Sequence, residues 1–290
     1  MSKVAIVTDS NSGITVDEAS KLGVYVLPMP FHIRDRDFFE GINIDQKNFY
    51  LMIDEGVEIG TSQPSPADVK ALWDDILTDH DSIVHIPMSS GLSGSCESAR
   101  MLAQNYNGRV EVADNKRISV TLRRSILDAK RMADEGMDAA SIRKKLEETG
   151  LDTTIYIMLD TLTYLKRGGR ITPTAAAIGT LLKIRPVLQL QGEKLDAYAK
   201  ARTPAQGRKL MIQAIRDDIQ KRFSGSRIVI DMAYTFDEEA LLSFREEVKE
   251  AFPWAGEIYY APLSLSVGCH IGPGALAVTA TVCDGDPVSM

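Results

Sequence analysis

The chain has few cysteines, and their spacing does not match that of a metal site. Cys96, Cys269 and Cys283 are the three present among 290 residues. A small, odd number of cysteines favours a reducing compartment over a disulfide framework. The histidines before residue 270 also show no mutual spacing. We therefore expect no metal centre.

Long hydrophobic runs are also missing. The run VAIV (4–7) is followed at once by Thr8 and Asp9. A membrane-spanning helix needs about 20 apolar residues, and the apolar part of a secretory signal needs at least about seven. We expect a cytoplasmic protein that is not stably inserted into a membrane.

The chain has no excess of positive charge. It carries 33 basic and 40 acidic side chains, which gives a formal charge of −7. Nucleic acids and anionic membranes attract proteins through a basic field. We therefore expect no nucleic-acid partner. With 44% apolar and 25% charged residues, the composition is that of an ordinary globular protein.

Short apolar runs alternate with helical patterns through the first half of the chain. The runs VAIV (4–7), SIVHIPM (82–88) and VEVAD (110–114) are each followed by helix-like sequence. This alternation predicts a mostly parallel sheet covered by helices. Ser65 and Pro66 are placed to begin one of these helices.

The second half has a different rhythm and predicts a separate α+β domain. VLQLQGEKLDAYAK is typical of a hairpin that turns at Gly192, and Thr203-Pro204 predicts the start of a long helix. Thr172-Pro173 predicts another helix, which continues to Leu182. We place an N-terminal α/β domain at residues 1–160 and a C-terminal α+β domain at 161–290.

A serine-glycine turn is the most informative local feature. SSGLSGS (89–95) follows an apolar run and precedes a helical pattern. The start of a helix exposes unpaired backbone N–H groups and the positive end of the helix dipole. With the serine hydroxyls, these groups make an anion site. Simple capping of the helix by the serines is the alternative interpretation.

The same turn permits a catalytic interpretation. GLSGS (91–95) is similar to a nucleophile elbow, but the position that needs glycine two residues after Ser93 holds Ser95. A serine hydrolase with Ser93 as nucleophile also needs a histidine, for which His270 in CHIGPG (269–274) is available, and an acid that no spacing identifies.

Two basic positions stand beside predicted helix ends. KRGGR (166–170) places Arg170 after a helix stop, and Arg202 precedes the Thr203-Pro204 helix start. Such cations complement the dipole at the C-terminus of a helix, or bind phosphate through the guanidinium fork.

The ordered set of motifs resembles the DegV family of bacterial fatty-acid-binding proteins. The motifs occur in the family's order over essentially the whole chain: VTDS (7–10), TSQPSP (61–66), SSGLSGS (89–95), YLKRGGRI (164–171), ART (201–203) and HIGPG (270–274).

The resemblance implies a two-domain fold and a carrier function. It implies a long-chain fatty acid whose carboxylate is held where the domains meet and whose acyl chain lies in a tunnel of the C-terminal domain. A separate ATP-dependent fatty acid kinase would convert the acid to acyl-phosphate for phospholipid synthesis. On this resemblance the protein is not an enzyme, has no catalytic residues of its own and needs no cofactor.

The resemblance also assigns residues. It places the carboxylate contacts on Thr61 and Ser93, with His270 in the hydrogen-bond network and Ser62 as a weaker contact. Arg170 and Arg202 match arginines linked to kinase docking or phosphoryl transfer. Cys96 departs from the tyrosine expected there, which affects the mouth of the pocket.

Other functions stay open at this point. The alternatives are a serine-type acyl hydrolase that uses Ser93 and His270, and a lipid-sensing regulatory protein. No segment indicates dimerisation, so we expect a monomer.

Overall fold

The computed structural model describes residues 3–178 and 184–283. The chain divides into two compact units, of which the first comprises Met1–Asp45 and Ile59–Leu151 and the second Gln46–Glu58 and Asp152–Met290. The second unit begins before the predicted boundary at 160, because strand β8 (Thr153–Met158) is part of its sheet. The segment 46–58 belongs to the second unit although both of its neighbours in sequence belong to the first.

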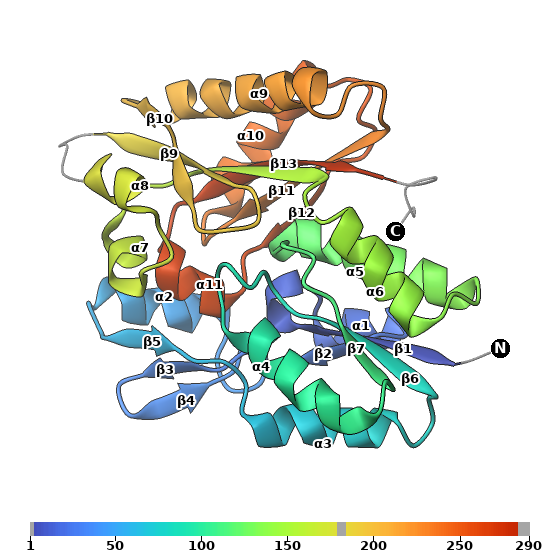
Figure 1. Cartoon of the computed structure of the whole chain (residues 1–290). Coiled ribbons are helices and arrows are strands. Elements are labelled where there is room, and N and C mark those ends of the chain that lie inside the picture. The colour runs from blue at the N-terminus through green and yellow to red at the C-terminus, as the bar shows by residue number, and fades with distance from the viewer. Residues whose placement is uncertain (1–2, 179–183, 284–290) are drawn as a thin grey trace. The chain divides into compact units, whose positions relative to one another are not determined.

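The first unit contains a parallel sheet of four strands, as the alternating pattern predicts (Figure 1). Its order is β2-β1-β6-β7. The bounds are β1 (Val4–Asp9), β2 (Tyr25–Leu27), β6 (Ser82–Ile86) and β7 (Val110–Val112). The chain leaves β1 towards one edge of the sheet and β6 towards the other, so the carboxyl ends of β1 and β6 form a topological switch point. Ligands of open α/β sheets bind at such points.

Helices cover both faces of this sheet (Figure 1). They are α1 (Val16–Leu22), α3 (Pro66–Ile76), α4 (Ser95–Ala103), α5 (Ser119–Asp134) and α6 (Ala139–Glu148), with 3₁₀ turns η1 (Ser10–Ser12) and η2 (Gln104–Tyr106). Helices α3 and α4 bury Trp73 and Cys96 against Ile83 of β6. Helix α5 contacts β1, and α6 contacts β6 and β7. The sheet thus has two covered faces, which explains its nearly continuous apolar strands.

The predicted start of α3 is confirmed. The Ser65 hydroxyl accepts the N–H of Asp68 at 3.1 Å, and Pro66 occupies the first helical turn. Proline costs nothing there, because the first-turn N–H groups have no partner within the helix. This start fixes the end of the TSQPSP loop to the helix that follows it.

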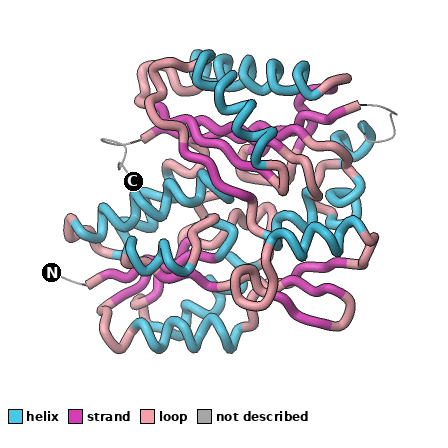
Figure 2. The backbone as a smooth tube through the Cα atoms, turned by 180° about the vertical axis from the view of Figure 1, so that it is seen from behind, coloured by secondary structure: helices cyan, strands magenta, loops and turns pink. Residues whose placement is uncertain are grey.

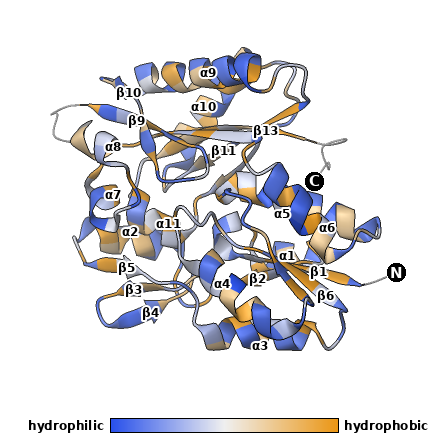
Figure 3. Ribbon diagram, viewed as in Figure 1, coloured by the Kyte–Doolittle hydropathy of each residue, from blue (hydrophilic) through white to orange (hydrophobic). Residues whose placement is uncertain are grey.

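A small antiparallel sheet that the pattern did not indicate is also part of the first unit. Its order is β4-β3-β5, with β3 (Phe31–Ile33), β4 (Arg36–Phe38) and β5 (Ile59–Thr61). In the hydropathy view β4 is hydrophilic, whereas β1 and β6 are hydrophobic (Figure 3). Three-residue strands carry too little periodicity to be recognised in a sequence.

The second unit has a six-stranded sheet of order β10-β9-β8-β13-β11-β12. Figure 2 shows the strands of the chain in magenta, seen from behind. It adds to β8 the strands β9 (Arg185–Leu190), β10 (Asp196–Ala201), β11 (Ile228–Tyr234), β12 (Tyr259–Pro262) and β13 (Leu276–Val282). All neighbours are antiparallel except β11 and β12. The hairpin that turns at Gly192 is confirmed, and this glycine has a φ of 92°.

The helices of the second unit include both predicted Thr-Pro starts. Their bounds are α2 (Gln46–Asp54), α7 (Thr163–Gly168), α8 (Pro173–Ile178), α9 (Pro204–Lys221), α10 (Glu238–Ala251) and α11 (Leu265–Ile271). The Thr203 hydroxyl caps α9 by accepting the Gln206 N–H at 3.2 Å. The predicted continuation of the Thr172-Pro173 helix over 179–182 lies outside the described residues.

Candidate functional site

The loops after β1 and β6 are tied together at the switch point. One carboxylate oxygen of Asp9 accepts the N–H of Asn11 at 2.9 Å, and the other accepts the N–H of Met88 at 2.8 Å. Asp9 therefore holds the DSNSG turn to the segment that leads into SSGLSGS. Both loops thus lie at the carboxyl ends of neighbouring parallel strands.

Asp9 and His85 carry strongly shifted pKa values because both are buried. Burial raises the pKa of Asp9 to about 6, although hydrogen bonds from Met88 and Asn11 oppose the shift. Burial also lowers the pKa of His85 to about 4. Each shift favours the uncharged form, as expected for groups removed from water.

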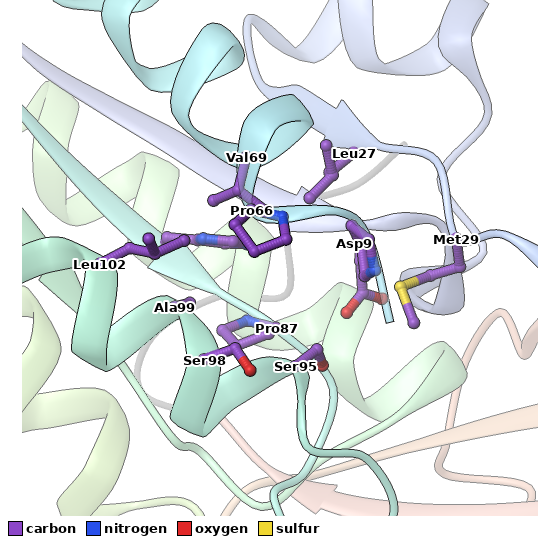
Figure 4. Close-up of a pocket in the computed structure, with 12 residues that line it drawn as sticks. Asp9, Leu27, Met29, Pro66, Val69, Pro87, Ser95, Ser98, Ala99 and Leu102 are labelled. Carbon is purple, nitrogen blue, oxygen red and sulfur yellow. The ribbon is translucent and has the colours of Figure 1, made fainter. Parts of the chain in front are cut away.

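A small cavity lies at this edge of the sheet (Figure 4). Its volume is about 10 Å³, enough for a single water molecule. Asp9, His85 and Ser95 supply polar groups to a lining that is otherwise largely apolar. Both ring nitrogens of His85 and the hydroxyl of Ser95 are buried without a partner among the described residues. The cavity is too small for a long-chain ligand.

The Ser93 hydroxyl is fixed at the start of α4. It accepts the N–H of Ser95 at 3.2 Å, and the cap residue Gly94 makes no side-chain cap bond. Ser93 thus caps the helix from one residue further out than a usual N-cap. No acceptor among the described residues takes its hydroxyl proton, so Ser93 can donate to an anion.

The TSQPSP loop is held beside the Ser93 turn. Thr61 is the last residue of β5 and pairs with Phe31. The side-chain oxygen of Gln63 accepts the hydroxyl of Ser98, on α4, at 3.0 Å. A Cβ on Gly94 would lie 3.3 Å from that same oxygen. The structure therefore links the loop that carries Thr61 and Ser62 to the turn that carries Ser93.

One residue that the sequence interpretation did not single out, His32, contacts Ser62, and a second, Asp37, contacts His32. His32 Nε2 lies 3.1 Å from the Ser62 hydroxyl oxygen, and His32 Nδ1 lies 2.5 Å from Asp37 Oδ1. Only the contact between His32 and Asp37 has a local signal in the sequence, which is a short hairpin. Arg34 and Asp35 form its two-residue turn, which sets His32 opposite Asp37.

In the second unit, His270 and Arg170 lie close together. Burial, with a smaller contribution from the positive charge of Arg170, lowers the pKa of His270 to about 4. His270 is therefore neutral at neutral pH. Arg170 is half-buried, and its Nη1 donates to the carbonyl of Gly168 at 2.5 Å.

Glycines explain why α7 and the HIGPG segment fit together. A Cβ on Gly168 would lie 2.0 Å from Nδ1 of His270, and a Cβ on Gly272 would lie 2.3 Å from the ring of Tyr164. Gly272 also has a φ of 76°, which disfavours other residues. The YLKRGG and HIGPG motifs thus pack directly against each other.

Arg202 is exposed just before α9, and its backbone N–H donates to the Gln206 side chain at 2.8 Å. The structure therefore groups the predicted residues within units: Thr61, Ser62 and Ser93 in the first, and His270, Arg170 and Arg202 in the second.

The described part of the chain contains no cluster of histidine, cysteine or acidic side chains that could hold a metal ion. Within residues 3–178 and 184–283, no helix is both long enough and apolar enough to span a membrane.

Two curated relatives match nearly the whole chain. A DegV domain-containing protein of Caldanaerobacter subterraneus subsp. tengcongensis is 30% identical over 284 residues, which cover 96% of this chain and 98% of the relative. Protein DegV of Bacillus subtilis is 28% identical over 279 residues, which cover 95% and 98% of the two chains.

Solved structures also match this chain over nearly its whole length. A DegV family protein from Thermus thermophilus, described as fatty acid binding, is 30% identical with a TM-score of 0.89 and covers 97% of this chain and 100% of its own. DegV of Bacillus subtilis, described as a fatty acid binding protein, is 26% identical with a TM-score of 0.85 and covers 98% and 100%.

A family model also matches residues 3–282, and its description is "Uncharacterised protein, DegV family". The chain therefore belongs to the DegV family and has the fold of that family.

Proposed function

We propose that this protein binds a long-chain fatty acid and carries it to a separate ATP-dependent fatty acid kinase. The observation that carries the proposal is the 30% identity, over nearly the whole chain, to a Thermus thermophilus protein described as fatty acid binding. The protein would itself be a monomeric, cytoplasmic carrier without cofactor or catalytic role in acyl-phosphate formation.

Neutral hydrogen-bond donors would hold the carboxylate of the fatty acid. Thr61 and Ser93 bind the carboxylate, Ser62 adds a weaker contact, and neutral His270 belongs to the hydrogen-bond network. Support comes from the unused proton of the Ser93 hydroxyl and from the helix start that follows it. The assignment of His270 rests on the HIGPG motif. Hydroxyl donors leave the carboxylate a better nucleophile towards phosphate than an arginine clamp would.

The acyl chain would lie on one face of the six-stranded sheet. This is the face opposite the one that packs on helices α9 and α10. One row of cross-strand neighbours on this face is entirely apolar and buried: Leu188, Ile157, Ala277, Ala233 and Ala261. Three adjacent alanines leave more room than the larger residues of the opposite face. Each methylene buried there contributes about 0.8 kcal/mol.

The binding test is to denature the purified protein, extract it with organic solvent and identify acids by mass spectrometry. We expect a long-chain acid at about one equivalent. Ala277→Ile should fill the row and release most of the acid, whereas exposed Ala67→Val should retain it. Absence of any acid, with no uptake of added fatty acid by the folded protein, would reject the proposal.

The carrier role has a separate test. Arg170 and Arg202 are proposed to contact the kinase or the transferred phosphate, so Arg202→Glu should keep the bound acid and lower acyl-phosphate formation by about tenfold or more, as loss of a charge-assisted contact predicts. Unchanged turnover with Arg202→Glu and Arg170→Glu together would remove the arginines from the proposal.

A further inference from the structure

The small sheet of the first unit brings a serine, a histidine and an aspartate to one face. His32 on β3 is paired with Asp37 on β4 and with Gly60 on β5. Ser62 lies two residues beyond Gly60, and residues two apart on an extended chain project from the same face. Because Gly60 has no side chain, the imidazole of His32 can reach across it to Ser62.

The atoms are in the order that nucleophilic catalysis requires. Asp37 Oδ1 lies 2.5 Å from His32 Nδ1, and the Ser62 hydroxyl oxygen lies 3.1 Å from His32 Nε2. The carboxylate accepts the proton of Nδ1, so Nε2 is left as the acceptor of the serine proton. A nucleophile, its base and the group that orients the base are recognised by this geometry, independently of their order in the sequence.

A backbone donor belongs to the residue that follows the nucleophile. The N–H of Gln63, the residue after the nucleophile, donates to no acceptor among the described residues. In serine hydrolases this N–H contributes to the oxyanion hole. The contact between Gln63 and Ser98 anchors the residue that carries this donor.

The orienting residue is also held in place. The side-chain amide of Asn43 donates to the carbonyl of Asp37 at 3.2 Å, while its oxygen accepts the N–H of Phe39 at 2.8 Å. The side chains of His32 and Asp37 are 39% and 64% exposed, so a substrate can reach the base. The same openness admits water.

We propose that Ser62, His32 and Asp37 form a catalytic triad that hydrolyses acyl esters or thioesters. The inference rests on the proposed function for the long-chain acyl group of the substrate, and it assigns the Ser62 contact with the carboxylate to the released acid, when the Ser62 proton is not donated to His32.

The reaction has two steps, acylation of Ser62 and hydrolysis of the acyl-serine. The Ser62 oxygen bonds to the acyl carbon as its proton passes to His32 Nε2, and the bond to the leaving alcohol or thiol breaks as that group takes the proton. Water then loses a proton to His32, attacks the acyl-serine carbonyl and releases the acid, and Ser62 recovers its proton.

The test is labelling of the full-length protein with a fluorophosphonate, followed by peptide mass spectrometry, with hydrolysis of p-nitrophenyl esters and of an acyl thioester measured in parallel. We expect the adduct on Ser62. Ser62→Ala should abolish it, and His32→Gln should slow labelling and ester hydrolysis by about 100-fold or more, the usual contribution of a general base. Asp37→Asn should slow both, since the wrong tautomer is then favoured.

Matched controls separate the site from general effects. Ser20→Ala, at an exposed position of α1, and His80→Gln, on the loop before β6, should leave both rates unchanged. Absence of an adduct in the folded wild-type protein, or an adduct on Ser93 with Ser62 unmodified, would overturn the proposal. The acid content of Ser62→Ala, measured by extraction, reports separately on fatty acid binding.

Discussion

Two buried ionisable side chains, Asp9 and His85, line one cavity and respond to pH in opposite directions. Asp9 has a raised pKa, so the folded state binds its proton more tightly than the unfolded chain does. Its contribution to stability is greatest at low pH and is lost as pH rises from about 4 to about 6. His85 has a lowered pKa, so its contribution is lost as pH falls from 6.5 to about 4. The two contributions nearly cancel across this window.

Replacing Asp9 should make that cancellation visible. In Asp9→Asn, only His85 still contributes to the pH dependence of the free energy of unfolding, because the opposing contribution of Asp9 is gone. We expect the free energy of unfolding of the variant, relative to wild type, to rise by about 3 kcal/mol between pH 4 and pH 6.5, because a shift of about two pKa units is worth that much. Urea unfolding at several pH values measures it. A difference that stays constant with pH would show that Asp9 is ionised in the folded protein throughout.

At the scale of elements, α7 and the end of α11 meet through glycine. The Cβ missing from Gly272 leaves room for the ring of Tyr164, and the one missing from Gly168 leaves room for His270. Gly274 is similar, since a Cβ there would lie 2.8 Å from a carboxylate oxygen of Asp160. Gly168, Gly272 and Gly274 are thus positions where one element touches another.

Gly272→Ala and Gly169→Ala form a matched pair that tests this contact. Both glycines have positive φ, of 76° and 69°, but ψ is 179° at Gly272 and 18° at Gly169, and a Cβ at Gly169 would meet nothing within 4 Å. We expect Gly169→Ala to lose about 1 kcal/mol of unfolding free energy, the backbone cost alone. Gly272→Ala should lose about 1–3 kcal/mol more, through displacement of Tyr164 and through a backbone conformation that residues other than glycine avoid. Equal losses in denaturant melts would mean that Tyr164 moves aside freely.

The elements that the sequence predicted well are those whose signals are local. Ser65 and Thr203 cap the helices that begin at Pro66 and Pro204, and Gly192 turns its hairpin. The contact of Ser62 with His32 was missed because it depends on pairing between β3 and β5, which lie far apart in the chain. Strand pairing is a tertiary property that no short pattern encodes.

At the scale of the whole molecule, the chain passes between the two units three times. It enters the second unit at Gln46, returns to the first at Ile59 and enters the second again at Asp152. Helix α2 belongs to the second unit through its aromatic residues. The ring of Tyr50 lies 5.1 Å from that of Phe236, and a Cβ on Gly268 would lie 2.9 Å from the Tyr50 hydroxyl.

Hydrogen exchange should show that helix α2 belongs to the second unit. Gly268→Val would press on Tyr50 and Phe49, so we expect the amides of α2 to exchange about tenfold faster or more, while those of β5 and α3 keep their rates. Gly225→Ala is the control, because a Cβ at that glycine of the second unit meets nothing within 4 Å and only the backbone cost of its φ of 80° applies. Faster exchange in β5 and α3 but not in α2 would contradict the division.

The placement of α2 also affects how the protein is made. Tyr50 leaves the ribosome 186 residues before its partner Phe236, which at ordinary elongation rates is an interval of roughly 10 to 40 s. Throughout that interval, Phe49 and Tyr50 have no finished surface to pack on, although the strands on both sides of them can already pair. A nascent chain of this protein therefore exposes an aromatic helix until synthesis is almost complete, which makes that helix a natural binding site for a chaperone.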